Sequence, residues 1–242
     1  MDAAIRRAAD TGAHLLDLSG QGLTRLPVSI GMLVSLDVLY LQGNALTALP
    51  DEICRLRGLS VLYLNDNQLV ELPPSIGDLH ELERLDVSGN RLTALPSTVG
   101  GLSALRELEL RGNRLRELPD RIGDLSRLEL LDVGQNRLAS LPSRIGDLVS
   151  LRELTLHGNR LTSLPPELGR LTGLTHLRLG DNGLLALPAE MAALTDLVEL
   201  TGLHDEPLMS AEFLAGNDGY WLAGAQQILA AYFTGGGFSA AG

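Results

Sequence analysis

A unit of 23 residues repeats along most of this chain. Leu-Pro pairs recur eight times at that interval, from Leu26-Pro27 to Leu187-Pro188. Seven asparagines have the same spacing: Asn44, Asn67, Asn90, Asn113, Asn136, Asn159 and Asn182. A fixed period of this length is typical of a solenoid, in which each unit stacks on the next. Eight units of 23 residues occupy positions 13–196.

The pattern inside one unit predicts its local structure. Counted from Leu36, leucine or a close substitute occupies positions 1, 4, 6, 11, 14, 18 and 21. Positions 4 and 6 alternate as in a strand, so their side chains point inward while positions 3, 5 and 7 face outward. The proline at position 15 leaves room only for a turn or a short 3₁₀ segment. The sequence therefore predicts an α/β solenoid shaped as a curved horseshoe. A parallel sheet would line its concave face, and short turns or 3₁₀ segments its convex face.

The repeated asparagines have a structural interpretation. Where the backbone leaves each strand and turns inward, its N–H and C=O groups would be buried without partners. A side-chain amide offers donors and an acceptor to those groups. We therefore interpret the seven asparagines as a structural ladder and not as a binding site.

These motifs resemble those of a known family. The pattern LxxLxLxxNxLxxLPxxIGxL is similar to the leucine-rich repeats of the Ras-group type. Such repeats occur in plant and animal Ras-scaffold proteins and before the GTPase domain of bacterial Roco proteins. The resemblance covers about three quarters of the chain. The resemblance implies a horseshoe that binds proteins. Separately, the many alanines, glycines and arginines and the absence of lysine suggest a GC-rich bacterial gene.

Both ends of the repeat array would expose leucine and need caps. We expect residues 1–12 to form a helical cap, with Ile5 and Ala9 inward and Gly12 ending the helix. We expect residues 13–196 to form the repeats and residues 197–233 to form a capping strand and helix, so that a helix caps each end. Residues 234–242 would form a flexible tail. In the second cap, helical spacing relates Trp221, Ala225, Ile228, Leu229 and Tyr232.

Composition disfavours several classes of function. The formal net charge is −11, and all 19 basic residues are arginine. The absence of lysine removes phosphate-loop and Schiff-base mechanisms, and the acidic balance argues against a nucleic acid or membrane partner. No apolar stretch reaches the length of a membrane span. Cys54 is the one cysteine, which we expect to be a packed thiol. We therefore expect a soluble, cytoplasmic and monomeric protein.

A search for catalytic patterns favours a protein that is not an enzyme and has no cofactor. The sequence shows no paired-carboxylate cleft, no Ser-His-Asp arrangement and no metal-ligand spacing. One cluster, His157, Asp181 and His204, could converge beside Gly180 and bind a metal ion. Because histidines are common on polar strand faces, we expect no metal there.

The outward-facing strand positions form columns across the repeats. Position 2 reads Glu83, Arg106, Glu129 and Arg152, which predicts a self-neutralising row of ion pairs. Position 5 reads Tyr40 and Tyr63 and then three carboxylates, Asp86, Glu109 and Asp132. Adjacent carboxylates repel one another, and a bound cationic group would relieve that cost. A solvated acidic face is the alternative interpretation.

The two tyrosines are candidates for a contact site, because exposed aromatic residues often anchor interfaces. We predict a protein partner with an apolar anchor near them and a basic segment along the carboxylates. The complete candidate surface is Val38, Tyr40, Val61, Tyr63, Arg84, Asp86, Glu107, Glu109, Arg111 and Asp132.

These features favour a non-enzymatic protein–protein interaction module that binds its partner on the concave face. A small-GTPase-linked signalling scaffold is a narrower version that the resemblance alone implies. The alternative is a secreted bacterial effector that docks on host proteins.

Overall fold

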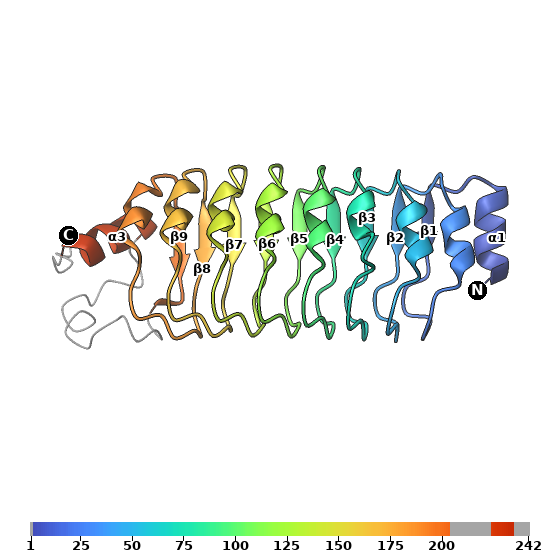
Figure 1. Cartoon of the computed structure of the whole chain (residues 1–242), viewed down its shortest axis with the longest axis horizontal. Helices are drawn as coiled ribbons and strands as arrows, with labels where there is room; N and C mark the ends of the chain where they lie inside the picture. Colours follow the sequence, from blue (N-terminus) through green and yellow to red (C-terminus); the bar gives the residue numbers. More distant parts are fainter. Residues whose placement is uncertain (1, 204–223, 235–242) are drawn as a thin grey trace.

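The computed structural model describes residues 2–203 and 224–234. This part of the chain is an elongated stack with one open parallel sheet (Figure 1). The sheet has nine strands in sequence order, which confirms the predicted solenoid. The strands are β1 (Leu15–Asp17), β2 (Val38–Tyr40), β3 (Val61–Tyr63), β4 (Arg84–Asp86), β5 (Glu107–Glu109), β6 (Leu130–Asp132), β7 (Glu153–Thr155), β8 (His176–Arg178) and β9 (Glu199–Thr201).

Each strand occupies positions 3 to 5 of its repeat. Leu39 pairs with Leu62, and Tyr40 pairs with Tyr63, so equivalent residues of neighbouring repeats lie side by side. The leucine in the middle of a strand points into the core, whereas the residues on either side of it face outward. The outward positions therefore form continuous columns along what we call the strand face.

Short 3₁₀ helices cover the opposite face of the stack (Figure 1). They are η1 (Val28–Met32), η2 (Asp51–Arg55), η3 (Ile76–Asp78), η4 (Ser97–Gly101), η5 (Asp120–Asp124), η6 (Ser143–Asp147), η7 (Pro166–Arg170) and η8 (Ala189–Ala193). Except at η3, the residue before each of these helices is the proline of the repeat, in extended conformation. Proline fixes φ and thereby sets the direction in which each helix begins.

The seven leucine positions of the repeat form one continuous core. In the repeat that contains β2, the seven corresponding side chains are all buried: Leu36, Leu39, Leu41, Leu46, Leu49, Ile53 and Leu56. The residues from the strand and from the 3₁₀ helix pack against each other and against both neighbouring repeats. Each repeat buries its apolar side chains mainly by stacking, as solenoids require.

The asparagine side chains join consecutive repeats through the backbone. Asn113 donates hydrogen bonds to the carbonyl oxygens of Val87 and Leu110, both at 2.9 Å. Its side-chain oxygen accepts a hydrogen bond from the N–H of Leu92, also at 2.9 Å. The equivalent contacts of Asn67, Asn90, Asn136 and Asn159 repeat this geometry. The ladder thus pairs carbonyl and N–H groups inside the stack.

Helices lie against both ends of the described repeats. In α1 (Asp2–Asp10), Ile5 and Ala8 are buried and Ala9 is partly buried. The chain turns after this helix at Gly12, where φ is +60°. In α3 (Ala225–Thr234), Ile228 and Leu229 pack on the last repeats. The domain boundaries remain predictions. Three predicted features lie outside the described residues: Trp221, His204 and residues 235–242 of the tail.

Specific polar contacts fix α3 in place. The Tyr232 hydroxyl accepts a hydrogen bond from the N–H of Leu187 at 3.1 Å. The Gln226 amide donates to the carbonyl oxygens of Leu194 and Leu197. Among the described helices, none has both the length and the apolar character that crossing a membrane requires.

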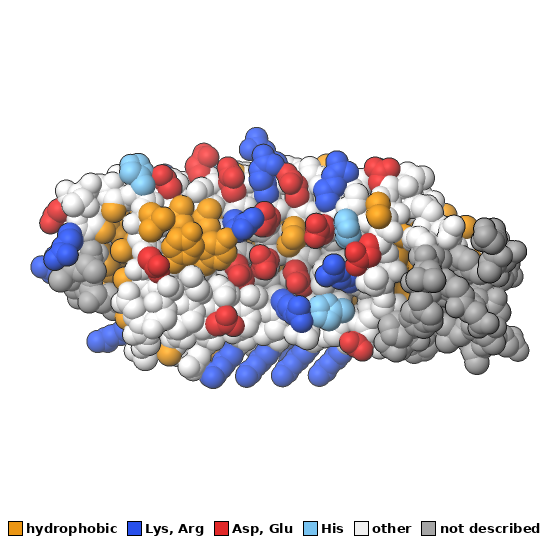
Figure 2. Space-filling view, turned by 180° about the vertical axis from the view of Figure 1, so that it is seen from behind, with side chains coloured by type: hydrophobic (Ala, Val, Ile, Leu, Met, Phe, Trp, Pro, Cys, Tyr) orange, Lys and Arg blue, Asp and Glu red, His pale blue; other side chains and the backbone are white. Residues whose placement is uncertain are grey.

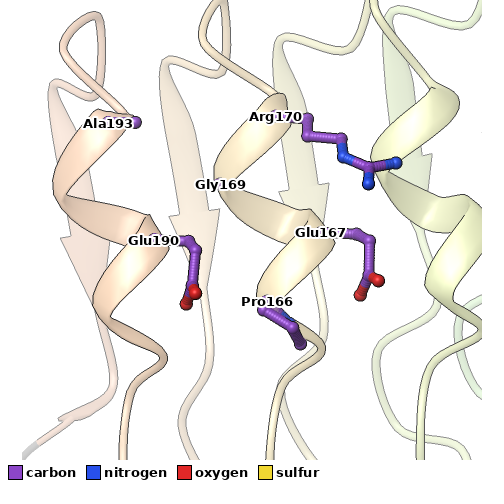
Figure 3. A pocket seen from close by; sticks show the side chains of 6 residues that line it. All are labelled: Pro166, Glu167, Gly169, Arg170, Glu190 and Ala193. Atoms are coloured by element: carbon purple, nitrogen blue, oxygen red, sulfur yellow. The ribbon is translucent and has the colours of Figure 1, made fainter.

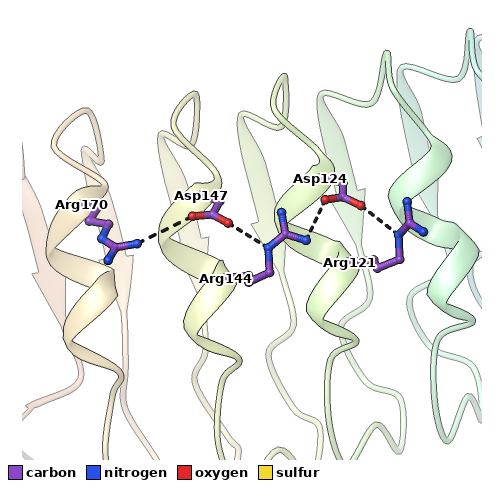
Figure 4. A network of polar contacts seen from close by, with 5 residues as sticks. All are labelled: Arg121, Asp124, Arg144, Asp147 and Arg170. Atoms are coloured by element: carbon purple, nitrogen blue, oxygen red, sulfur yellow. Dashed lines mark hydrogen bonds and ion pairs between the residues drawn. The ribbon is translucent and has the colours of Figure 1, made fainter.

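A chain of ion pairs runs across η5, η6 and η7 on the face opposite the strands (Figure 4). Asp124 lies between Arg121 and Arg144, at 2.9 and 2.8 Å. Arg144 also contacts Asp147 at 3.0 Å, and Arg170 approaches Asp147 at 3.9 Å. Hydrogen bonding from Arg144, together with Arg121, lowers the pKa of Asp124 below its usual value. The pairs are partly exposed, so each contributes modestly to stability.

Candidate functional site

Tyr40 and Tyr63 form a stacked pair on the strand face. Their ring centroids are 5.4 Å apart, and the ring planes differ by 5°. The parallel register produces this arrangement, because both tyrosines occupy position 5 of adjacent strands. Both rings are half-buried, so one ring face or edge of the pair remains accessible. Such rings lose little conformational entropy when a partner covers them.

Three aliphatic residues extend the tyrosine pair into an apolar patch. Val38 and Val61 lie at position 3 of the same two strands, and Leu15 pairs with Val38 from β1. Leu15 is 54% exposed, although it belongs to a strand. Figure 2 shows orange side chains gathered near one end of this face, bordered by charged ones. We call Leu15, Val38, Tyr40, Val61 and Tyr63 the aromatic patch.

Arg84 connects the aromatic patch to the charged part of the face. One guanidinium nitrogen donates a hydrogen bond to the Tyr63 hydroxyl at 3.0 Å. The other terminal nitrogen makes a hydrogen-bonded ion pair with Glu107 on the next strand. The Tyr63 hydroxyl and Glu107 together raise the pKa of Arg84 above its usual value. These contacts orient both Tyr63 and Arg84 on the face.

Asp86, Glu109 and Asp132 occupy one column on β4, β5 and β6. The parallel register places Glu109 directly between the two aspartates. Asp86 is only 8% exposed and accepts a hydrogen bond from the N–H of Ser88 at 2.9 Å. Asp132 makes the equivalent contact with the N–H of Gly134 at 2.8 Å. The aspartates therefore also hold the turns after their strands.

Glu109, the middle carboxylate of the row, has a pKa above its usual value. Partial burial raises its pKa, and the charges of Asp86, Asp132 and Glu107 raise it further, whereas Arg84 acts in the opposite direction. The row therefore favours a positively charged ligand, whose approach would offset this repulsion.

Replacing Glu109 with glutamine should stabilise the protein at neutral pH. A carboxyl group whose pKa is raised by folding adds stability below its ordinary pKa, and this contribution is lost as the pH rises through the raised value. We expect Glu109→Gln to raise Tm at pH 7 by about 1 to 3 °C, with little difference at pH 4. Thermal unfolding followed by circular dichroism measures both values. Glu153→Gln on β7 is the control, and equal effects of the two substitutions at pH 7 would contradict the role of Glu109.

Two sets of predicted residues lie outside the aromatic patch and the carboxylate row: Arg111 of the candidate surface, and the charged column at position 2. The guanidinium of Arg111 is exposed and donates a hydrogen bond to the Gln135 side chain at 3.2 Å, so it lies farther along the face. The predicted row of ion pairs at position 2 forms only between Arg106 and Glu129. Arg152 instead donates to the backbone oxygen of Gly173 at 2.7 Å, because that carbonyl lies within reach. The predicted ion pairing at position 2 is thus confirmed for Arg106 with Glu129, whereas Arg152 contacts a backbone carbonyl oxygen.

Comparisons with known proteins identify the repeat. Models described as leucine-rich repeat, or leucine-rich repeat region, match residues 12–69, 60–133 and 150–171. The solved leucine-rich repeat domain of the type III effector XCV3220 (XopL) is 30% identical with a TM-score of 0.72. The match covers 82% of this chain and 71% of that domain. This chain belongs to the leucine-rich repeat family.

Two further solved structures are similar to this leucine-rich repeat protein. The Leptospira interrogans LRR protein LIC12759 is 34% identical, with a TM-score of 0.61; the match covers 87% of this chain and 66% of that one. The Yersinia pestis leucine-rich effector YopM is 31% identical, with a TM-score of 0.68; the match covers 83% of this chain and 52% of that one. The chain thus spans between about half and two thirds of the length of these two relatives. No curated protein sequence matches it significantly.

The described residues of the leucine-rich repeat chain offer few other sites. They contain no group of three or more histidine, cysteine, aspartate or glutamate side chains that could hold a metal ion. His157 lies beside Gly134 on the strand face, and Asp181 is in the turn after β8, but their predicted companion His204 is not among these residues. A shallow hollow between η7 and η8 is lined by Pro166, Glu167, Gly169, Arg170, Glu190 and Ala193 (Figure 3). Its lining residues include two glutamates and one arginine but no serine, threonine, cysteine, histidine or lysine.

Sequence reasoning missed Leu15 and the bridging role of Arg84. Leu15 could have been found from the position 3 column, which begins Leu15, Val38, Val61. The contact of Arg84 with Tyr63 crosses from position 3 of one strand to position 5 of the previous one. Comparing equivalent positions of the repeats could not have revealed this contact, because it joins two different positions on neighbouring strands.

Proposed function

We propose that this leucine-rich repeat chain is a non-enzymatic module that binds a protein partner on its strand face. The observation that carries the proposal is the stacked Tyr40–Tyr63 pair, which stays half-exposed beside three aliphatic side chains. Aromatic residues in such settings commonly supply much of the binding free energy of an interface. A cytoplasmic monomer is part of the same proposal.

The partner should combine an apolar anchor with a basic segment. The anchor would cover the aromatic patch, and the basic segment would lie along Asp86, Glu109 and Asp132. The raised pKa of Glu109 supports the second contact, since a nearby cation would lower it again. Opposite charges would also accelerate association and fix the orientation of the partner.

Two biological settings are compatible with this binding mode. A scaffold for small-GTPase signalling rests on the Ras-group resemblance of the repeats. A secreted bacterial effector is the second candidate, and its support is the similarity to YopM and to XopL, both of which are described as effectors. Purified partners from the native organism or from host extract would separate the two settings.

Removal of both tyrosine rings should weaken partner binding by at least about tenfold, because two interface aromatics contribute more than about 1 kcal/mol each. The variant is Tyr40→Ala/Tyr63→Ala, and calorimetry with the isolated partner gives the dissociation constants. Thr155→Ala/Thr201→Ala, in the same column on β7 and β9, is the matched control. Unchanged affinity of the tyrosine variant, with its circular dichroism spectrum intact, would exclude the aromatic patch as the contact.

A further inference from the structure

Four arginines form a row on consecutive repeats, away from the aromatic patch. Arg91, Arg114, Arg137 and Arg160 each follow the asparagine of their repeat, at position 10. All four are exposed. Blue side chains projecting in parallel along one edge of the molecule are visible in Figure 2. We call these four residues the arginine row.

The backbone holds the arginine row in strict register. The N–H of each arginine donates to the carbonyl oxygen at position 11 of the preceding repeat, at 2.9 Å in all four cases. Arg91 donates to Leu69 and Arg160 to Leu138, for example. Each arginine also adjoins a buried asparagine that is itself hydrogen-bonded to two repeats. Four guanidinium groups therefore extend from rigid, equivalent anchor points.

The arginine row lacks the carboxylate partners that several other arginines of the described chain have. Arg84, Arg106, Arg121, Arg144 and Arg178 all contact an acidic side chain. Within residues 2–203 and 224–234, the four side chains of the row make neither an ion pair nor a hydrogen bond. The adjacent outward positions 8 and 12 of these repeats bring no carboxylate: they are Gly89, Thr93, Gly112, Arg116, Gln135, Ala139, Gly158 and Thr162.

We propose that the arginine row binds an acidic, extended segment of a polypeptide. Guanidinium groups pair with carboxylates through two parallel hydrogen bonds, and unpaired neighbouring cations gain from such contacts. Three inter-strand steps of about 4.8 Å give a row of about 14 Å, the length of roughly five extended residues. A single-stranded nucleic acid fits less well, because the flanking positions contain no aromatic ring on which bases could stack.

A peptide of ten glutamates, labelled with fluorescein, provides the direct test by fluorescence anisotropy. The protein as a whole has a net charge of −11 and therefore repels an acidic peptide. Binding of this peptide would thus indicate a local, positively charged site. We expect binding at low salt that weakens as salt is added. Arg91→Gln/Arg114→Gln/Arg137→Gln/Arg160→Gln should reduce affinity by about tenfold or more. A peptide of ten glutamines should not bind.

Matched controls decide between the row and other causes. Arg25→Gln/Arg55→Gln/Arg57→Gln/Arg127→Gln removes the same charge from scattered exposed positions and should change affinity by less than about twofold. The proposal is wrong if both variants lose affinity equally, if the unaltered protein does not bind the peptide, or if oligouridine binds more tightly. Tyr40→Ala/Tyr63→Ala should leave peptide binding unchanged, which separates this site from the strand-face proposal.

Discussion

Asn113→Ala is expected to lower the free energy of unfolding by about 3 kcal/mol, because three backbone groups lose their partner at once. The amide of Asn113 pairs with the carbonyl oxygens of Val87 and Leu110 and with the N–H of Leu92. All three lie inside the stack, where water cannot readily replace the lost contacts. Urea denaturation followed by circular dichroism measures the change.

Two substitutions test the origin of this effect. Asn113→Asp preserves the acceptor for Leu92 but loses both donors, so a loss of stability close to that of alanine is expected. Arg114→Ala changes the exposed neighbouring residue and should alter stability by less than about 0.5 kcal/mol. If Asn113→Ala were as mild as Arg114→Ala, the asparagine ladder would have no major structural role.

The fold follows from the sequence because the repeat is so regular. The pattern of one 23-residue unit predicts the strand, the 3₁₀ helix that follows the proline, and the inward leucines. The same local structure then forms in each stacked repeat. Even the ninth strand was predictable, since Leu197 and Leu200 continue the pattern. Registration of equivalent residues made the proximity of Tyr40 and Tyr63 predictable as well.

Contacts between non-equivalent positions were not predictable from the repeat. Arg84 reaches diagonally to Tyr63 and straight across to Glu107, and long side chains can choose among several such partners. Asp86 is nearly buried because it caps its own turn, although its column is otherwise more exposed. The partners of Arg84 and the burial of Asp86 depend on side-chain length and on local turn geometry. An alignment of equivalent repeat positions does not reveal either of these.

Glycines at position 19 of the repeat determine how closely the 3₁₀ helices stack. A Cβ atom added at Gly123 would lie 2.5 Å from the carbonyl oxygen of Arg144 in the next helix. Gly100, Gly146 and Gly169 show the same approach to backbone oxygens of their neighbours. A backbone oxygen cannot move without shifting its whole helix, so these positions require glycine.

Cys54 shows how the chain accommodates a side chain at this position. Its thiol is buried, as predicted, and burial raises its pKa. The facing helix η3 (Ile76–Asp78) has three residues, whereas the other 3₁₀ helices in the described chain have five. Ser75, the residue before η3, acts against burial and lowers the pKa of the thiol in part. A larger residue at position 19 thus coincides with a shortened neighbour.

Gly123→Ala should therefore destabilise the protein by about 1 to 3 kcal/mol, the usual cost of forcing an extra methyl group into a packed interface. The reason is that η6 has its full five residues and would have to move away from η5. Gly58→Ala is the matched control: its nearest neighbour would be 3.9 Å away, so the change should be neutral or slightly stabilising. Urea denaturation of both variants gives the comparison. Equal stability of the two would show that the helices can separate without cost, and that the glycine column does not set the spacing of the stack.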